Sequence, residues 1–388
     1  MRDINSLIEF IRGIYGQDYI PLHRPVFEGN ERSRLIACID SNFVSSVGPE
    51  VIEFENRIAE FVGCRYAVAT VNGTAALHIA LQLAGVKHGD EVISQALTFI
   101  ATCNAISYAG AKPVFVDVDL DTLGMSPVSL RRWLVDNIEL RDGHAINSKT
   151  GARISACVPM HTFGLPCRIE EIVAICEEFG IPVVEDAAES LGSYVGVRHT
   201  GTFGLLSTLS FNGNKIVTTG GGGMIVTDDE SLAKQAKHMT TTAKVLHPYE
   251  FEHDLVAYNY RLPNLNATLG CSQMEKLPIM LEIKAEIARR YQEFCAANQL
   301  KYIAALPNTT PNYWLNAIVL DDLTQRNAFL EHTNRQGIMT RPVWKLMSSL
   351  MMFKNCQNDG LETSRWLEER VVNLPSSVPE SEFWRIRQ

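Results

Sequence analysis

Apolar side chains first recur at helical spacing near residue 50. Val51, Phe54 and Ile58 lie three or four positions apart, in a stretch that starts at Pro49 and stops at Gly63. This spacing places the three side chains on one face of a helix, and the two flanking residue types are common at helix starts and ends. The pattern therefore predicts a helix that packs one face into a folded domain.

From residue 66 onward, short apolar runs alternate with longer stretches of helical periodicity. Such alternation is typical of right-handed crossovers and of a mostly parallel sheet covered by helices on both faces. Only a glycine-rich loop separates the last two runs, so we expect at least one antiparallel edge. The predicted strands are Tyr66–Val71, Glu91–Ser94, Pro113–Val118, Ile154–Pro159, Pro182–Asp186, Ser207–Phe211 and Met224–Thr227, and the predicted helices are Ala75–Ala84, Phe99–Ala109, Val128–Asn137 and Ile169–Phe179.

The pattern changes after Asn264. One long helix, Leu277–Gln299, is followed by a strand, a helix and a strand at Trp314–Leu320, Leu323–Gln336 and Ile338–Arg341. The N-terminal stretch 1–15 is amphipathic and is expected to join this smaller α+β unit. The sequence thus predicts a large domain over residues 20–264 and a small C-terminal domain over 265–388 with 1–19, packed tightly because no low-complexity linker separates them.

Composition narrows the class of protein. The chain has 388 residues, 46% hydrophobic and 20% charged, with a net charge of −9 and no dense basic stripe. Nucleic acid is therefore not expected as a partner. The N-terminus lacks a signal-peptide layout, and no apolar run approaches the roughly 18 residues of a membrane span, so we expect no membrane association.

The cysteines and histidines indicate neither disulfides nor metal. Nine cysteines are scattered singly without a C-x-x-C pair, as expected for reduced, mostly buried thiols of a cytoplasmic protein. The residues His23, His78, His161 and His199 stand apart in sequence, and each is interpreted first as an ordinary core or surface histidine. We expect no metal site.

A turn between a strand and a helix is the first candidate for chemistry. Asn72, Gly73, Thr74 and Ala75 fall where a predicted strand ends and a helix begins. The unpaired N–H groups and the dipole of such a helix start favour a phosphate group. Alternatively, Thr74 is only the N-cap of the helix.

Two further positions add an acid and an amine. Asp186 ends an apolar strand at the carboxyl edge of the predicted sheet, where open α/β sheets bind ligands, and it could pair with a protonated ring nitrogen; the alternative is a helix cap. Lys215 is a single lysine in an apolar, glycine-rich stretch, where loss of water favours a nucleophilic neutral amine. A surface charge in a flexible loop is the alternative, and Ser210 lies close enough in sequence to reach the same phosphate as Gly73.

A helix start for phosphate, an acid for a pyridinium nitrogen and a lysine for an imine are together what pyridoxal 5′-phosphate requires of a protein. The set resembles the DegT/DnrJ/EryC1 family of sugar aminotransferases, which share the α/β fold type I of pyridoxal-phosphate-dependent transferases. The resemblance runs from about residue 20 to about residue 341 and rests on six motifs. These are Val44–Pro49, Asn72–Leu77, Thr98–Thr102, Glu185–Glu189, Ser210–Phe211 with Lys215, and Tyr258–Arg261.

The resemblance implies roles for individual residues. It matches Lys215 to the catalytic lysine that holds the cofactor as a Schiff base, and Asp186 to the acid on the pyridine nitrogen. Phe99 matches the aromatic that stacks on the cofactor ring. Gly73, Thr74 and Ser210 match phosphate ligands. Asn259 matches a residue that reaches the phosphate of the neighbouring subunit, and Arg261 lies in the same motif. The resemblance thus implies a homodimer with shared active sites.

The chain departs from the family pattern at two positions. Gly221 stands where the family commonly has glutamate, and Glu189 stands where it often has histidine or glutamine. A carboxylate at Glu189 could accept a bond from the cofactor hydroxyl or from substrate, or could form a structural ion pair. For the substrate itself we expect contacts from Ser46, His161 and Arg341, with a structural role as the alternative for Arg341.

The stretch Pro21–Pro25 with Phe27, Gly29 and Asn30, together with Val44–Gly48, resembles the branch acting on UDP-4-keto-6-deoxy-N-acetylhexosamines. This resemblance implies amino transfer from L-glutamate to the C4 ketone of a nucleotide-linked sugar, in bacterial surface glycan, bacillosamine or nonulosonic acid biosynthesis. One alternative is a sugar dehydratase of the same fold, in which histidine replaces the lysine; Lys215 argues against it. The other is a non-catalytic nucleotide-sugar sensor or regulator, which would not need the lysine.

Overall fold

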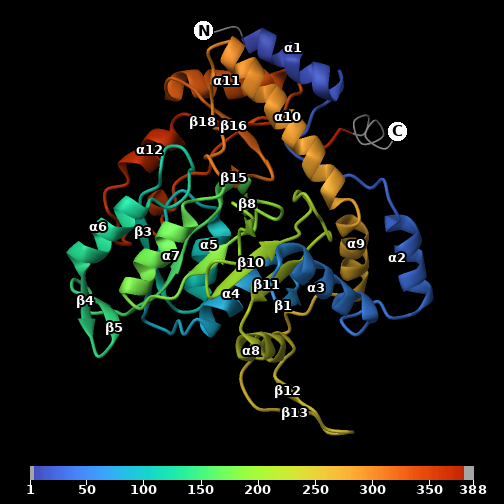
Figure 1. The fold of residues 1–388 in the computed structure, drawn as a ribbon, viewed down its shortest axis with the longest axis vertical. Helices are drawn as coiled ribbons and strands as arrows, with labels where there is room; N and C mark the ends of the chain where they lie inside the picture. Colours follow the sequence, from blue (N-terminus) through green and yellow to red (C-terminus); the bar gives the residue numbers. More distant parts are fainter. Residues whose placement is uncertain (1–3, 380–388) are drawn as a thin grey trace.

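The computed structural model describes residues 4–379, arranged as a large α/β unit with a smaller unit above it (Figure 1). The large unit is built on seven strands, in which β6 joins β7 through bridges at Cys157–Val183 and Met160–Asp186. In spatial order the strands are β3 (Lys112–Val116), β2 (Glu91–Gln95), β6 (Ile154–Val158), β7 (Val184–Asp186), β10 (Leu206–Ser210), β11 (Gly223–Thr227) and β1 (Tyr66–Thr70).

The direction of the strands corrects one prediction. Strand β11 runs antiparallel to both of its neighbours, β10 and β1, so β1 runs in the same direction as β10. The antiparallel strand is therefore internal, and the edge strand β1 is parallel to the rest. The mostly parallel, seven-stranded sheet is otherwise confirmed.

Helices cover both faces of this sheet, which explains why its strands are almost continuously buried. Adjacent residues point to opposite faces, so Val92 packs into one apolar cluster with Leu77 of α4, and Ile93 packs into another with Trp133 of α6. The covering helices are α3 (Pro49–Val62), α4 (Gly73–Leu83), α5 (Ile100–Tyr108), α6 (Pro127–Asn137), α7 (Ile169–Glu178) and α8 (Glu230–Thr240).

The small unit combines helices α10 (Leu277–Ala297) and α11 (Leu323–Arg335) with an antiparallel sheet. Helix α1 (Ile4–Tyr15) lies against α10, where the Phe10 ring stacks on Phe294 at 4.4 Å, so the amphipathic helix is found where it was predicted; residues 1–3 lie outside the described residues. The sheet has the order β14 (Lys301–Tyr302), β16 (Asn316–Val319), β18 (Val371–Leu374) and β17 (Arg341–Pro342).

Several elements were not predicted from the sequence. Helix α9, which opens at the predicted domain boundary, packs on α2 and α3 of the large unit, and the exact division into domains stays a prediction. Besides α8, β14 and β18, the unpredicted elements are α2 (Glu31–Asp40), α9 (Asn264–Met274), α12 (Glu362–Glu368), β4 (Ile138–Arg141), β5 (His144–Asn147), β8 (Tyr194–Val195), β9 (Arg198–His199), β12 (Lys244–Val245), β13 (Glu252–His253) and β15 (Thr309–Thr310), with 3-10 turns at Thr162–Gly164 and Met347–Ser349.

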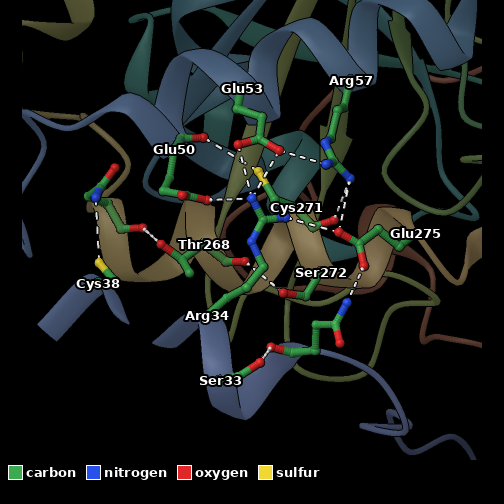
Figure 2. A network of polar contacts seen from close by, with 12 residues as sticks. Ser33, Arg34, Cys38, Glu50, Glu53, Arg57, Thr268, Cys271, Ser272 and Glu275 are labelled. Atoms are coloured by element: carbon green, nitrogen blue, oxygen red, sulfur yellow. Dashed lines mark hydrogen bonds and ion pairs between the residues drawn. The ribbon is translucent and has the colours of Figure 1, made fainter. Parts of the chain in front are cut away.

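A polar network fastens α2 to α3 and α9 (Figure 2). Arg34 donates to both carboxylate oxygens of Glu53 at 3.0 Å and to Glu275 at 3.0 Å. Glu50, Glu53 and Cys271 are also the group of potential metal ligands found among residues 4–379, with ligand atoms within 4.8 Å of one another. The guanidinium of Arg34 already pairs with both carboxylates, so a cation is supplied there by the chain itself.

No helix among the described residues is long and apolar enough to cross a membrane. All nine cysteines are free, and only Cys64 and Cys356 are not buried.

Candidate active site

A cavity of about 340 Å³ opens where β7 and β10 end, at the carboxyl edge of the sheet. Open α/β sheets bind their ligands at this edge, because the strand ends and the following helix starts converge there. The cavity wall includes seven residues that the sequence singled out: Gly73, Thr74, Phe99, Asp186, Glu189, Ser210 and Lys215.

The start of α4 forms an anion cradle in one wall of the cavity. The side chain of Asn72 caps the helix by accepting from the N–H of Ala75 at 2.7 Å, so the alternative that Thr74 is the N-cap is wrong. The first backbone bond of the helix runs from Ala76 to Asn72, which leaves the N–H groups of Gly73 and Thr74 available to an anion.

Glycines keep this cradle open. A Cβ added at Gly73 would lie 3.0 Å from the Cβ of Ser210, and one at Gly223 would lie 2.4 Å from the carbonyl atoms of Asn72. The strand end and the helix start therefore approach too closely for any side chain between them. This geometry, with the Ser210 hydroxyl beside it, fits a phosphate group.

Asp186 lies buried at the end of β7, with its carboxylate held in place. The hydroxyl of Thr102 donates to one oxygen at 2.6 Å, and the N–H of Ala188 donates to the other at 3.2 Å. Burial raises the pKa of Asp186, against the lowering effect of these two bonds. Turns rather than a helix follow it, so the helix-cap alternative is wrong, and the carboxylate suits a cationic partner such as a protonated ring nitrogen.

Lys215 extends into the cavity and is not a solvated surface charge, because its side chain is only 13% exposed. Its Nζ lies 3.2 Å from Oε1 of Glu189 and 3.7 Å from the centre of the Trp314 ring. The N–H of Phe163 donates to the second oxygen of Glu189 at 2.9 Å. Burial, which is the largest influence on this carboxyl group, raises the pKa of Glu189 to about 7.

Three aromatic side chains line the cavity. Phe99, at the start of α5, is 48% exposed, and its ring centre lies 6.2 Å from that of Trp344. The exposed ring of Phe99 offers a face for a flat heterocycle. Trp314 and Trp344 were not found from the sequence, since no local motif marks them. Asn212 and Asn214 lie between Ser210 and Lys215, but the sequence indicated no role of their own for them.

Other predicted site residues lie away from this cavity. His161 does not reach its surface, contrary to the expected substrate contact: the side chain is fully buried, Nε2 lies 3.0 Å from Glu185, and Nδ1 accepts from the N–H of Cys167. Arg341 also lies elsewhere, donating to Asn334 in the last turn of α11 at 2.8 Å and to the carbonyl of Thr340.

Ser46 and Asn259 are absent from the cavity wall of their own chain. Ser46 lies half-buried in the loop before α3, and Asn259 is exposed, with its Oδ1 accepting from Arg261 at 3.2 Å. A residue that serves the site of a partner subunit must lie outside its own cavity, so the position of Asn259 is compatible with that expectation.

The buried acid, the lysine and the phosphate-sized cradle open onto one cavity of a type I α/β fold, and this combination defines a pyridoxal-phosphate-dependent enzyme. Sequence comparison gives the family. The chain belongs to the DegT/DnrJ/EryC1/StrS aminotransferase family, whose model matches residues 26–380. It is therefore a pyridoxal-phosphate-dependent sugar aminotransferase, and the predicted family, fold and cofactor are confirmed.

Individual relatives are similar along almost the whole chain. GDP-perosamine synthases of Escherichia coli O157:H7 and Vibrio cholerae are 37% and 34% identical to it, over 92% of this chain and 93% and 94% of theirs. Among solved structures, an aminotransferase of this family from Brucella abortus superimposes with a TM-score of 0.82 at 26% identity, covering 92% of this chain and 93% of that one.

Proposed function

We propose that the protein transfers the amino group of L-glutamate to the C4 ketone of a nucleotide-linked 4-keto-6-deoxyhexose. The observation that carries this proposal is the convergence of Lys215, Asp186 and the α4 cradle on one cavity, in a chain similar to enzymes named for a nucleotide-linked amino sugar. The bound cofactor supplies an electron sink and a temporary carrier for the amino group.

Each residue has a task in this proposal. The N–H groups of Gly73 and Thr74 and the hydroxyl of Ser210 hold the phosphate, and Phe99 stacks on the ring. Asp186 keeps a ring nitrogen protonated, because a buried carboxylate gains most from a cationic partner. The amine of Lys215 moves the proton of the reacting carbon, and Glu189, with its near-neutral pKa, exchanges protons with that amine.

The relatives favour a GDP-linked sugar. Two of them, each covering more than nine-tenths of this chain, are named GDP-perosamine synthase. The resemblance to the UDP-N-acetylhexosamine branch rests on two short stretches, one within residues 21–30 and the other Val44–Gly48. Phe27 in the first is exposed, and no residue of either stretch lines the cavity of its own chain. We therefore place the GDP-linked keto sugar first and keep the UDP-linked one as the alternative to be tested.

We further propose that two copies of the chain share their sites. Residues 244–256, which include β12 and β13, extend away from the body of the molecule below α8 (Figure 1). Leu246, Tyr249, Phe251 and Val256 are each at least 80% exposed on this projection. Large apolar side chains gathered on a projecting segment are typical of an interface, and Asn259 lies at its base.

The test is product analysis with purified protein. Incubation with L-glutamate and GDP-linked or UDP-linked 4-keto-6-deoxy sugars should give 2-oxoglutarate and a product in which an amine replaces the ketone, identified by mass spectrometry. Lys215→Ala is the matched control and should give neither. An amine from the UDP-linked N-acetyl sugar alone would reverse the order of the two substrates, and no amine from either would contradict the proposal.

A further inference from the structure

Lys284 is a buried lysine outside the cavity. It lies on the inner face of α10 with 1% of its surface exposed. Its Nζ donates to the carbonyls of Ser376 at 2.5 Å and Trp314 at 3.2 Å, and it lies within hydrogen-bond distance of Nε2 of His23 at 3.1 Å. Burying an amine costs free energy unless its bonds are replaced, and these three partners offset that cost.

The surroundings of Lys284 make a charged amine at this position unfavourable. Burial lowers the pKa of Lys284 to about 7, and it also lowers the pKa of the neighbouring His23, with Lys284 as a further cause. A methionine or leucine would fill the same space without a polar group to satisfy. The amine therefore calls for an explanation beyond packing.

Trp314 connects Lys284 to the cavity. Its carbonyl accepts from Lys284, while its indole Nε1 donates to the carbonyl of Asn214 at 2.8 Å. The face of the ring lies 3.7 Å from Nζ of Lys215. One residue thus contacts the buried lysine through its backbone, and the cavity lysine and its loop through its side chain.

The backbone on the N-terminal side of Trp314 is also held by hydrogen bonds. The N–H of Trp314 donates to Oδ1 of Asn312 at 2.8 Å, and the amide of Asn312 donates to the carbonyls of Glu189 and Leu191. Asn312 therefore fixes the segment to the turn that carries Glu189. Without Lys284, the carbonyl side of Trp314 would lose its bond to α10.

We propose that Lys284 is a positioning residue for the cavity: by holding the backbone of Trp314, it fixes the indole ring against Lys215 and keeps the loop that carries Lys215 in register with Glu189. The proposal concerns the placement of Trp314, and only its catalytic consequence rests on the proposed function, in which Lys215 is the reactive amine. A positioned ring restricts the amine to a narrow range of directions, which matters for proton transfer.

A purely structural role for Lys284 makes a different prediction. Through Ser376, Lys284 also fastens the segment that follows β18, and such anchoring could be its whole purpose. Tyr291 is a matched control, because it lies on the same buried face of α10 and its hydroxyl donates to the adjacent carbonyl of Pro375 at 2.9 Å. Tyr291→Phe loosens that segment without touching Trp314.

The first measurement uses cofactor-free protein and no catalysis. Acrylamide quenching of tryptophan fluorescence is compared in the wild type, Lys284→Met and Tyr291→Phe. Each of the three is measured with and without Trp314→Phe, so that the difference isolates the signal of Trp314. Trp314 is 5% exposed. Lys284→Met should make Trp314 more accessible to acrylamide, and Tyr291→Phe should not. Equal accessibility in all three proteins would overturn the proposal whatever the enzyme does.

The second measurement uses the holoenzyme. Lys284→Met should lower kcat roughly 10-fold, the size of effect expected when a reacting group is slightly misplaced, with little change in the KM for L-glutamate. Lys284→Gln keeps two N–H donors and should recover part of kcat, which also covers the case in which the methionine variant does not fold. If kcat fell equally in Lys284→Gln and Tyr291→Phe, Lys284 would only anchor the C-terminal segment, and the proposal would be wrong. Displaced Trp314 with unchanged kcat would instead count against Lys215 as the reactive amine.

Discussion

Nζ of Lys215 lies 3.2 Å from Oε1 of Glu189, whose pKa burial raises to about 7. A carboxyl group within hydrogen-bond distance of an amine can pass a proton to it or take one from it, which is the geometry expected of a proton-transfer pair. The sequence left Glu189 between a ligand of cofactor or substrate and a structural ion pair. The observed pair is an ion pair with the cavity lysine itself.

The pKa of Glu189 makes the stability of the protein depend on pH. The folded state retains a proton up to about pH 7, whereas the ordinary value for glutamate is 4.5. Between these values the folded state binds more protons than the unfolded chain, so the contribution of Glu189 to stability falls as the pH rises. Urea unfolding of cofactor-free protein should show the wild type losing stability relative to Glu189→Gln as the pH rises from 4.5 to about 7.

The control for this prediction is Glu60→Gln, at an exposed glutamate of α3. Its stability difference from the wild type should stay constant over the same pH range. A constant difference for Glu189→Gln as well would mean that Glu189 does not titrate in this window.

Lys215 should be the one lysine that carries the cofactor. Borohydride reduction of the holoenzyme followed by peptide mapping should place the pyridoxyl group on Lys215, because it is the lysine whose side chain lines the cavity. Lys284 is also buried away from water, but its amine donates to the carbonyls of Trp314 and Ser376. A reduced pyridoxyl group on Lys284 or Lys276 would show that Lys215 does not carry the cofactor.

Asp186→Asn should keep the cofactor and lose most of the activity. The amide fills the same space, but it no longer holds a ring nitrogen protonated, so the ring withdraws electrons less well. We expect kcat to fall roughly 100-fold, as when one preorganised electrostatic contact is lost. Cofactor content is read from the visible absorbance. Activity near that of the wild type at full cofactor occupancy would exclude Asp186 from the reaction.

Residues that lie close in sequence were the predictable part of the site. Asn72 and Gly73 form a turn between a strand and a helix, and Asp186 ends a strand, so local periodicity locates them at the carboxyl edge of the sheet. Lys215 was predicted from its apolar surroundings, and its low exposure agrees with them.

The unpredicted part depends on contacts between distant segments. Trp314 contacts Lys215 although almost a hundred residues separate them in sequence. The sequence around Trp314 predicts only the start of a strand. Strand β18 completes the small sheet between β16 and β17, although it follows them by tens of residues. The position of β11 inside the large sheet likewise depends on pairing with β1, which periodicity does not encode.

Two positions of the glycine-rich loop, Gly221 and Gly223, should differ in their tolerance of a side chain. Gly223→Ala would place a methyl group 2.4 Å from the backbone of Asn72, whereas the nearest atom to a Cβ at Gly221 is 3.9 Å away. We expect Gly223→Ala to lower the unfolding free energy by about 1–3 kcal/mol, as overpacking does, and to weaken cofactor binding. Gly221→Ala is the matched control and should leave both close to wild type. Equal effects of the two changes would contradict the close approach at Gly223.

The shared site can be tested by exchanging subunits. Lys215→Ala and Asn259→Asp should each be inactive, the second because it sets a negative charge against the phosphate of the partner chain. In a mixed dimer one site combines both lesions, while the other has its own Lys215 and an intact Asn259 from its partner. Random mixing of equal amounts should therefore restore about a quarter of wild-type activity, since half of the dimers are mixed and each has one sound site.

The control mixture decides whether the recovery is specific. Lys215 and Asp186 line the same cavity of one chain, so a mixed dimer of Lys215→Ala and Asp186→Asn has one lesion in each site and should stay inactive. Asn259, in contrast, is exposed and lies outside the cavity of its own chain, with only Arg261 bound to its Oδ1 among the described contacts. Recovery in the first mixture and not in the second would require Asn259 to act across the interface. If the first mixture stays inactive although tagged chains show that mixed dimers have formed, Asn259 acts within its own subunit and the sites are not shared.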